Sequence, residues 1–102
     1  LGSLWLIEVD SAPVGYVAVP YGYTFEFGGR DGWVDELFVV ESHRSLGLGG
    51  WALAELQRRA DELGLVAIHL QTEHYNERAK KLYESLGFRN LKRSTLTWLN
   101  QS

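Results

Sequence analysis

Apolar and polar residues alternate along the first forty positions with the period of two that is typical of β-strands, so the chain should open as an antiparallel meander. The predicted strands are residues 4–9, 14–19, 23–27 and 33–40. Residues 10–13 are expected to form a hairpin turn and residues 28–32 a flexible loop. Pro20 and Gly22 are expected to interrupt pairing. Because residues 37–40 are all apolar, the last strand is expected to be buried on both faces in the middle of the sheet.

The next segment changes to the spacing of three and four residues that one face of an α-helix requires. A helix is predicted over residues 49–63, and Gly64 follows it where a left-handed C-terminal cap belongs. Residues 65–70 then form a short apolar strand. A strand, a helix and a strand in this order normally make a right-handed parallel crossover. We therefore expect residues 65–70 to lie parallel to the strand that ends at Val40, with a crevice between them.

A second helix is predicted to begin at Asn76, a good N-cap residue, and to end at Gly87 and Phe88. Its apolar stripe consists of Ala79, Leu82, Tyr83 and Leu86. Residues 95–99 are expected to form one more strand. This order of elements predicts an α/β (α+β) fold with a mixed, mostly antiparallel central sheet, a splayed parallel strand pair and flanking helices.

Composition narrows the classes of function. A chain of 102 residues is expected to form one domain, residues 1–102. It has no cysteine and its three histidines lack metal-ligand spacing, so neither a disulfide nor a metal is predicted. The apolar runs are shorter than the roughly 20 residues of a membrane span, and a net charge of −3 without a basic cluster argues against nucleic acid. We expect a cytoplasmic protein whose mildly acidic surface suits an amine substrate.

The candidate chemistry begins at a glycine turn after the apolar strand. Residues 46–51 include Gly47 and Gly49 and lead into a helix, so free backbone N–H groups and the positive end of the helix dipole should face outward. This pattern is typical of a phosphate site, to which Arg44 would add a charge-assisted hydrogen bond. The same glycines could merely shape a tight loop, and both interpretations are open at this point.

Gly47, Gly49 and Ala52 also match the dinucleotide-binding pattern G-x-G-x-x-A, with Glu73 at a suitable distance to hold a ribose. Two observations weigh against a dinucleotide. In that pattern the first glycine follows the strand almost directly, whereas residues 41–44 intervene here, and this chain begins with antiparallel strands. The dinucleotide site is therefore the weakest of the hypotheses.

The two segments together resemble the GNAT superfamily of N-acetyltransferases. The arginine and glycine segment 44–49 is similar to the acyl-CoA-binding signature of that family, and the helical segment 76–88 is similar to its second signature. The resemblance covers residues 33–89. It implies acetyl-CoA as the cosubstrate and the fold of that family.

The resemblance also implies roles for individual residues. The backbone amides that would bind the pyrophosphate of CoA belong to Leu46, Gly47, Leu48, Gly49 and Gly50. The strand residues that would pair with the pantetheine arm are Leu37, Phe38, Val39 and Val40. Tyr83 would protonate the departing thiolate. Asn76 would bind the pantetheine or phosphate region, or would only cap its helix.

A protonated amine cannot attack a thioester until it loses a proton, so a base is needed. Glu36 is the predicted base because the resemblance places an acidic residue there, and Asp35, acting through water, is the alternative. Adjacent strand residues point to opposite faces, so only one of them can face the acyl group unless a bulge intervenes. Both could instead be carboxylates at a strand edge in solvent. His69 is expected to be a hydrogen-bonded interior residue, and His74 to lie at the mouth of the crevice.

The resemblance has one departure. Members of this family usually begin with a strand and two helices that form one wall of the acceptor pocket, whereas this chain begins at the hairpin. Either the chain is a fragment, or it takes that wall from a second copy in a homodimer, or it binds acyl-CoA without catalysis. The predicted function is transfer of an acetyl group from acetyl-CoA to a primary amine of a small molecule, peptide or protein by direct attack. A non-catalytic acyl-CoA-binding or regulatory module is the alternative.

Overall fold

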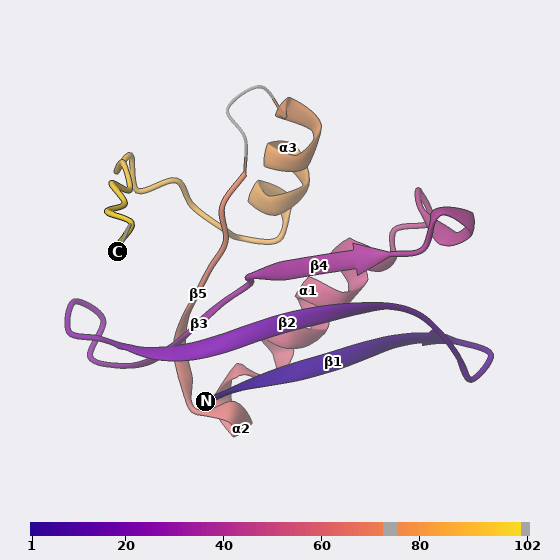
Figure 1. The fold of residues 1–102 in the computed structure, drawn as a ribbon, viewed down its shortest axis with the longest axis horizontal. Coiled ribbons are helices and arrows are strands. Elements are labelled where there is room, and N and C mark those ends of the chain that lie inside the picture. The colour runs from indigo at the N-terminus through magenta and orange to yellow at the C-terminus, as the bar shows by residue number, and fades with distance from the viewer. Residues whose placement is uncertain (73–75, 101–102) are drawn as a thin grey trace.

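The computed structural model describes residues 1–72 and 76–100 (Figure 1). Its strands are β1 (Gly2–Val9), β2 (Ala12–Thr24), β3 (Gly29–Trp33), β4 (Glu36–Val39) and β5 (Leu65–His69). Its helices are the 3-10 turn η1 (Glu41–His43), α1 (Leu48–Arg58), α2 (Ala60–Leu63) and α3 (Glu77–Ser85). The mixed α/β architecture, with a mostly antiparallel sheet and one parallel pair, is the predicted one. No helix in the described ranges is long and apolar enough to span a bilayer.

The long strand β2 organises the sheet. It pairs antiparallel with β1 along one edge, and with β4 and then β3 along the other. Asp10 and Ser11 make the first hairpin turn with positive φ angles of 52° and 68°, which suits the right-handed twist of the flanking strands. The turn is thus shorter than predicted, and Pro20 and Gly22 lie within β2 rather than interrupting it.

The glycine-rich segment predicted as a loop is instead strand β3, because β2 continues to Thr24 and offers it a partner. The predicted strand 23–27 correspondingly ends at Thr24, and residues 25–28 form the turn. Both corrections follow from the pairing of β2 with β3. Pairing with a neighbouring strand outweighs the low intrinsic β-propensity of glycine.

The predicted strand 33–40 is divided by a β-bulge. Tyr21 pairs with Gly32, and Ala18 pairs with Glu36, so three steps along β2 oppose four steps along the other chain segment. The extra residue falls at residues 34–35, between β3 and β4. The second half is also not buried on both faces, since Phe38 is 40% exposed.

The parallel pair separates at this bulge. The prediction placed β5 beside the strand that ends at Val40, whereas β5 pairs with β3 and not with β4. The pairing ends where the backbone N–H of Val34 donates to the carbonyl of His69 at 2.8 Å. Beyond that bond β4 continues along β2, while the chain after β5 leads toward α3 (Figure 1). The sheet therefore has a gap in its pairing after Val34, where the two strands expected to flank the crevice separate.

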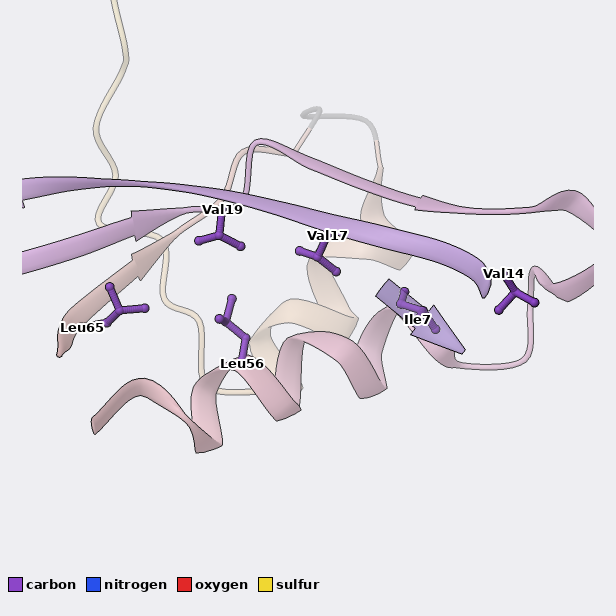
Figure 2. Packing of buried hydrophobic residues seen from close by; sticks show 6 residues of the cluster. All are labelled: Ile7, Val14, Val17, Val19, Leu56 and Leu65. Atoms are coloured by element: carbon purple, nitrogen blue, oxygen red, sulfur yellow. The ribbon is translucent and has the colours of Figure 1, made fainter. Parts of the chain in front are cut away.

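The core lies between the sheet and α1. Figure 2 shows Val17 and Val19 of β2 pointing toward Leu56 of α1, together with Ile7, Val14 and Leu65. We call this side of the sheet the helix face, and the other side the opposite face. Burial of such side chains is the dominant favourable term in folding, and it fixes α1 against the strands.

The helical predictions need smaller corrections. The predicted helix 49–63 is interrupted at Arg59, which separates α1 from α2, and Gly64 caps α2 with φ 73° as predicted. Residues 95–99 form no strand, and they pair with none of the described strands.

Candidate functional site

The glycine turn ends in a helix N-terminus without a side-chain cap. Gly47 occupies the N-cap position with φ 79°, a left-handed conformation that glycine adopts without strain. The first intrahelical hydrogen bond runs from Trp51 N–H to the Gly47 carbonyl at 3.0 Å. The preceding amides of Leu48, Gly49 and Gly50 therefore have no partner within the helix, and the first turn contains no acidic residue. This end of α1 carries the positive end of the helix dipole.

Two neighbouring elements, β4 and α3, pack against the glycine turn. A Cβ atom placed on Gly49 would lie 3.4 Å from Leu37 of β4, and one on Gly50 would lie 3.2 Å from Leu82 of α3. Glycine at these positions thus lets β4 and α3 approach the start of α1. Gln57 also connects α1 to the end of α3, because its side-chain amide donates to the Leu86 carbonyl at 2.8 Å.

An open groove of roughly 520 Å³ lies between the glycine turn and the start of α3. Its lining residues are Ser45, Gly47, Asn76, Arg78, Ala79 and Leu82. The structure thus brings together Gly47 and Asn76, which sequence reasoning had predicted from two separate segments. It adds Ser45 and Arg78, whose only sequence signal is that each stands beside a predicted site residue. Arg78 supplies a cation at the wall of this groove.

Asn76 caps α3. Its side-chain oxygen accepts a hydrogen bond from the Ala79 amide at 3.1 Å. This is the ordinary stabilising role of an N-cap residue, and it fixes the side chain at the groove.

The side chain of Arg44 packs against β4 and does not line the groove. Its Nε atom donates to the Val39 carbonyl at 2.8 Å, and its guanidinium carbon lies 5.7 Å from the centre of the Phe38 ring. The guanidinium is exposed and on a flexible stem. Contact with a phosphate in the groove would require it to leave these partners.

β4 presents one edge to the gap. It pairs with β2 along its other edge, and within residues 1–72 and 76–100 no strand pairs with the edge toward β5. Leu37, Val39 and Val40 are half-buried against the core, while Phe38 points to the opposite face. An extended ligand could add main-chain hydrogen bonds there as a further strand would.

The two candidate bases are both exposed. Asp35 lies in the bulge, which is the circumstance in which both carboxylates could approach one face. The Glu36 carboxylate accepts a hydrogen bond from the Tyr16 hydroxyl at 2.8 Å, and this bond raises the pKa of Tyr16 above its ordinary value. The ring of Tyr16 lies 5.7 Å from that of Phe38. Tyr16 was not a predicted site residue, and only its register opposite Phe38 reveals it.

Tyr83 is half-buried on α3, and its ring makes an edge contact with Phe88 at 6.3 Å between centroids. It does not line the groove, although the preceding Leu82 does. Glu73, the ribose ligand of the dinucleotide hypothesis, and His74 lie outside the described residues. In the described part of the chain no three His, Asp or Glu side chains cluster as metal ligands would.

These features describe an α/β domain with an uncapped helix N-terminus at a gap in its sheet. The sequence model of the Acetyltransferase (GNAT) family matches residues 2–88. The chain belongs to this family.

Individual relatives agree with this assignment. The chain is 37% identical over 57 residues to D-amino-acid N-acetyltransferase HPA3 of Saccharomyces cerevisiae, which covers 56% of this chain and 35% of that protein. It is 40% identical over 55 residues to the uncharacterized N-acetyltransferase YhfO of Bacillus subtilis, which covers 54% and 37%. The chain thus spans little more than a third of these relatives.

The fold has a solved counterpart. An integron cassette protein, HFX_CASS3, from the mobile metagenome of Cole Harbour Salt Marsh superposes with a TM-score of 0.81 at 32% identity. The superposition covers 97% of this chain and 60% of that one.

Proposed function

We propose that this chain binds acetyl-CoA and transfers its acetyl group to a primary amine by direct attack. The observation that carries the proposal is the uncapped N-terminus of α1 at the point where β4 and β5 separate. A pyrophosphate needs several N–H donors that bulky side chains do not obstruct, and the Leu48, Gly49 and Gly50 amides fit this need. A Cβ on Gly47 would meet no atom within 4 Å, so there is open space beside the turn.

The remaining parts of the cosubstrate would follow the groove and the gap. Arg78 would neutralise phosphate charge from the wall of the groove, and Arg44 would do so after leaving Phe38. The pantetheine arm would pair with the free edge of β4, with Asn76 beside it. This path would bring the thioester to the bulge at residues 34–35, where Asp35 and Glu36 lie.

The bound thioester supplies an activated acetyl group. Glu36, or Asp35 through water, would remove a proton from the amine, and Tyr83 would protonate the sulfur that leaves. The name of the yeast relative, a D-amino-acid N-acetyltransferase, supports an amine as the acceptor. A non-catalytic acyl-CoA-binding module would share the cosubstrate site and lack the transfer.

The phosphate site can be tested with a matched pair of variants at Ser45. Ser45 is exposed at the groove with φ 67°, a conformation that Asp and Asn both tolerate. Ser45→Asp introduces a negative charge beside the pyrophosphate, whereas Ser45→Asn introduces a side chain of the same size without charge. We expect the Asp variant to bind CoA about tenfold more weakly than the Asn variant, equal to about 1.4 kcal/mol.

Titration calorimetry of both variants with CoA, acetyl-CoA and NAD measures this difference. The difference should shrink as salt is raised, since screening weakens exposed charges. Equal affinities of the two variants would remove the phosphate site from the proposal, and tighter binding of NAD than of CoA would remove CoA as its ligand.

The proton donor can be tested at Tyr83. Tyr83→Phe removes only the hydroxyl and keeps the contact with Phe88. If Tyr83 protonates the leaving sulfur, kcat should fall by about 100-fold with CoA affinity unchanged. Thiol release with a panel of amines gives kcat, and an unaltered kcat would exclude Tyr83 from the chemistry.

A further inference from the structure

A buried carboxylate and a histidine face each other across the parallel strand pair. Asp31 of β3 is 5% exposed, and its Oδ2 atom lies 3.0 Å from Nε2 of His69 on β5. Its Oδ1 atom has no hydrogen-bond partner among the described residues. Burying a carboxylate is unfavourable unless hydrogen bonds or an opposite charge compensate it, and only one of the two oxygens of Asp31 has a partner among the described residues. The pair is therefore weak evidence for a contribution to stability.

Glycine at position 22 makes room for this carboxylate. A Cβ atom there would lie 2.8 Å from Oδ1 of Asp31. Gly22 thus keeps β2 from displacing the acid. The pairing of the two side chains spans 38 residues of sequence, which is why sequence reasoning assigned Asp31 to a loop and His69 to the interior.

The Asp31–His69 pair lies on the opposite face of the sheet, at the point where β4 and β5 begin to separate. Gly32 points to the core, since a Cβ atom on it would contact Val19 and Leu65, so its neighbours Asp31 and Trp33 point the other way. His69 is paired with Trp33, and its carbonyl accepts the Val34 amide where the two strands part.

Glu36 belongs to this same face. It is paired with Ala18, which is paired with Leu4, and Tyr16 and Phe38 occupy the next row. The Asp31–His69 pair and the predicted base thus approach the gap from one side of the sheet.

The environment of the ring fixes its orientation. An ionised carboxylate only accepts hydrogen bonds, so opposite such a group the neutral ring of His69 would carry its proton on Nε2 and leave Nδ1 as the acceptor. The rings of Trp33 and Phe27 lie 4.5 Å and 6.4 Å from the imidazole centre. The side chain is 25% exposed, so part of the ring remains accessible.

In the part of the chain that the structure describes, two acidic groups face the ring, and one of them is paired with an arginine. They are Asp31 from β3 and Glu26 from the turn at residues 25–28. Arg93 binds Glu26 through two hydrogen bonds of 2.6 Å and, with a weaker contribution from His69, holds the pKa of Glu26 below its ordinary value.

We propose that His69, oriented by Asp31, accepts the proton of the attacking amine in the acetyl transfer. The inference rests on the proposed function and assigns the role of the base to His69 in place of Glu36 or Asp35. The amine nitrogen forms a bond to the acetyl carbonyl carbon, and the bond from that carbon to sulfur breaks. The amine proton goes to Nδ1 of His69, and the sulfur takes a proton from Tyr83. Asp31 is a positioning residue, and the acceptor amine enters from the opposite face of the sheet.

The test uses His69→Gln, whose side-chain amide still provides an N–H donor for Asp31 but is not a base. Acetyl transfer is measured as a function of pH, together with CoA affinity and Tm. We expect kcat to fall by about 100-fold and the acid limb of the kcat/KM profile to disappear, while CoA affinity and Tm stay near those of the parent chain. His43→Gln on η1 is the matched control and should keep the parent profile.

Three results would overturn the inference. The first is a His69→Gln variant with the kcat and pH profile of the parent. The second is a variant whose Tm falls while the shape of its pH profile is retained, as a structural pair requires. The third applies if His69→Gln does not fold: Asp31→Asn, which removes the charge beside the ring, would then leave the acid limb at its parent position instead of displacing it.

The proposed function fails separately. A parent chain that binds CoA but releases no thiol with any amine removes both the transfer and the role of His69. An active parent with an unaffected His69→Gln variant removes the role of His69 alone.

Discussion

The two faces of the sheet are built from the same strands and carry different side chains. On the helix face, alternate residues of β1 and β2 such as Ile7, Val17 and Val19 are at most 3% exposed and pack against α1. On the opposite face, the intervening rows carry Tyr16, Glu36 and the Asp31–His69 pair. Because side chains alternate along a strand, each strand can contribute to stability with one set of positions and to chemistry with the other.

The helix α1 connects the core on the helix face with the glycine turn. Its buried residues Leu53 and Leu56 anchor it to the helix face, and its first turn lies beside β4, where a Cβ atom on Gly49 would lie 3.4 Å from Leu37. The position of the glycine turn therefore depends on the core. Damage to the core should affect the whole chain, whereas damage to the opposite face should affect chemistry alone.

The largest effect is expected from Leu56→Ala on the helix face. Leu56 is 5% exposed within the core, and removing its side chain loses transfer free energy and leaves a cavity. The free energy of unfolding should fall by about 2–5 kcal/mol. For a chain of this size the Tm should then fall by about 8 °C or more, at roughly 4–8 °C per kcal/mol. Urea denaturation and a thermal scan measure both quantities.

Leu96→Ala is the control for this substitution. Leu96 is 93% exposed in the C-terminal segment, so the same chemical change should alter the free energy of unfolding by no more than about 0.5 kcal/mol. Equal losses for the two variants would contradict the assignment of the core to the helix face.

The sequence was sufficient where local signals agree with the fold. The first hairpin, the amphipathic face of α1, the cap at Gly64 and the cap at Asn76 were all predicted from neighbouring residues. In each of them, periodicity and capping chemistry act over a few positions, so no knowledge of distant partners was needed.

It was insufficient where pairing is long-range. β3 was taken for a loop because its glycines are poor strand formers, and residues 95–99 were taken for a strand because they alternate in polarity. In both, the presence or absence of a neighbouring strand decided the outcome. The bulge at residues 34–35 and the partner of β5 depend on register across the whole sheet.

The same distinction holds for the site. The order of elements predicted that Gly47 and Asn76 would meet, and they line one groove. Two other features depend on the side-chain conformations of the folded chain. They are the contact of Arg44 with Phe38 and the Asp31–His69 pair. No short motif encodes either of them.

The smallest effect is expected from the Tyr16–Glu36 hydrogen bond on the opposite face. The hydroxyl of Tyr16 donates to the Glu36 carboxylate, and this raises the pKa of Tyr16 because ionisation would remove the donor and place two negative charges together. A group whose pKa is higher in the folded state stabilises that state below its unfolded pKa, here about 10. The contribution is lost as the pH rises through the higher folded value.

Glu36→Gln removes the charge and should return the pKa of Tyr16 toward its ordinary value. Spectroscopic titration of tyrosinate, with Tyr16→Phe identifying which signal belongs to this residue, measures the change. The Tm near neutral pH should barely differ between Glu36→Gln and the parent, since both groups lie at the surface where solvent screens them. A large loss of Tm in Glu36→Gln would mean that this bond supports the fold, and the separation of stability and chemistry between the two faces would then be wrong at this position.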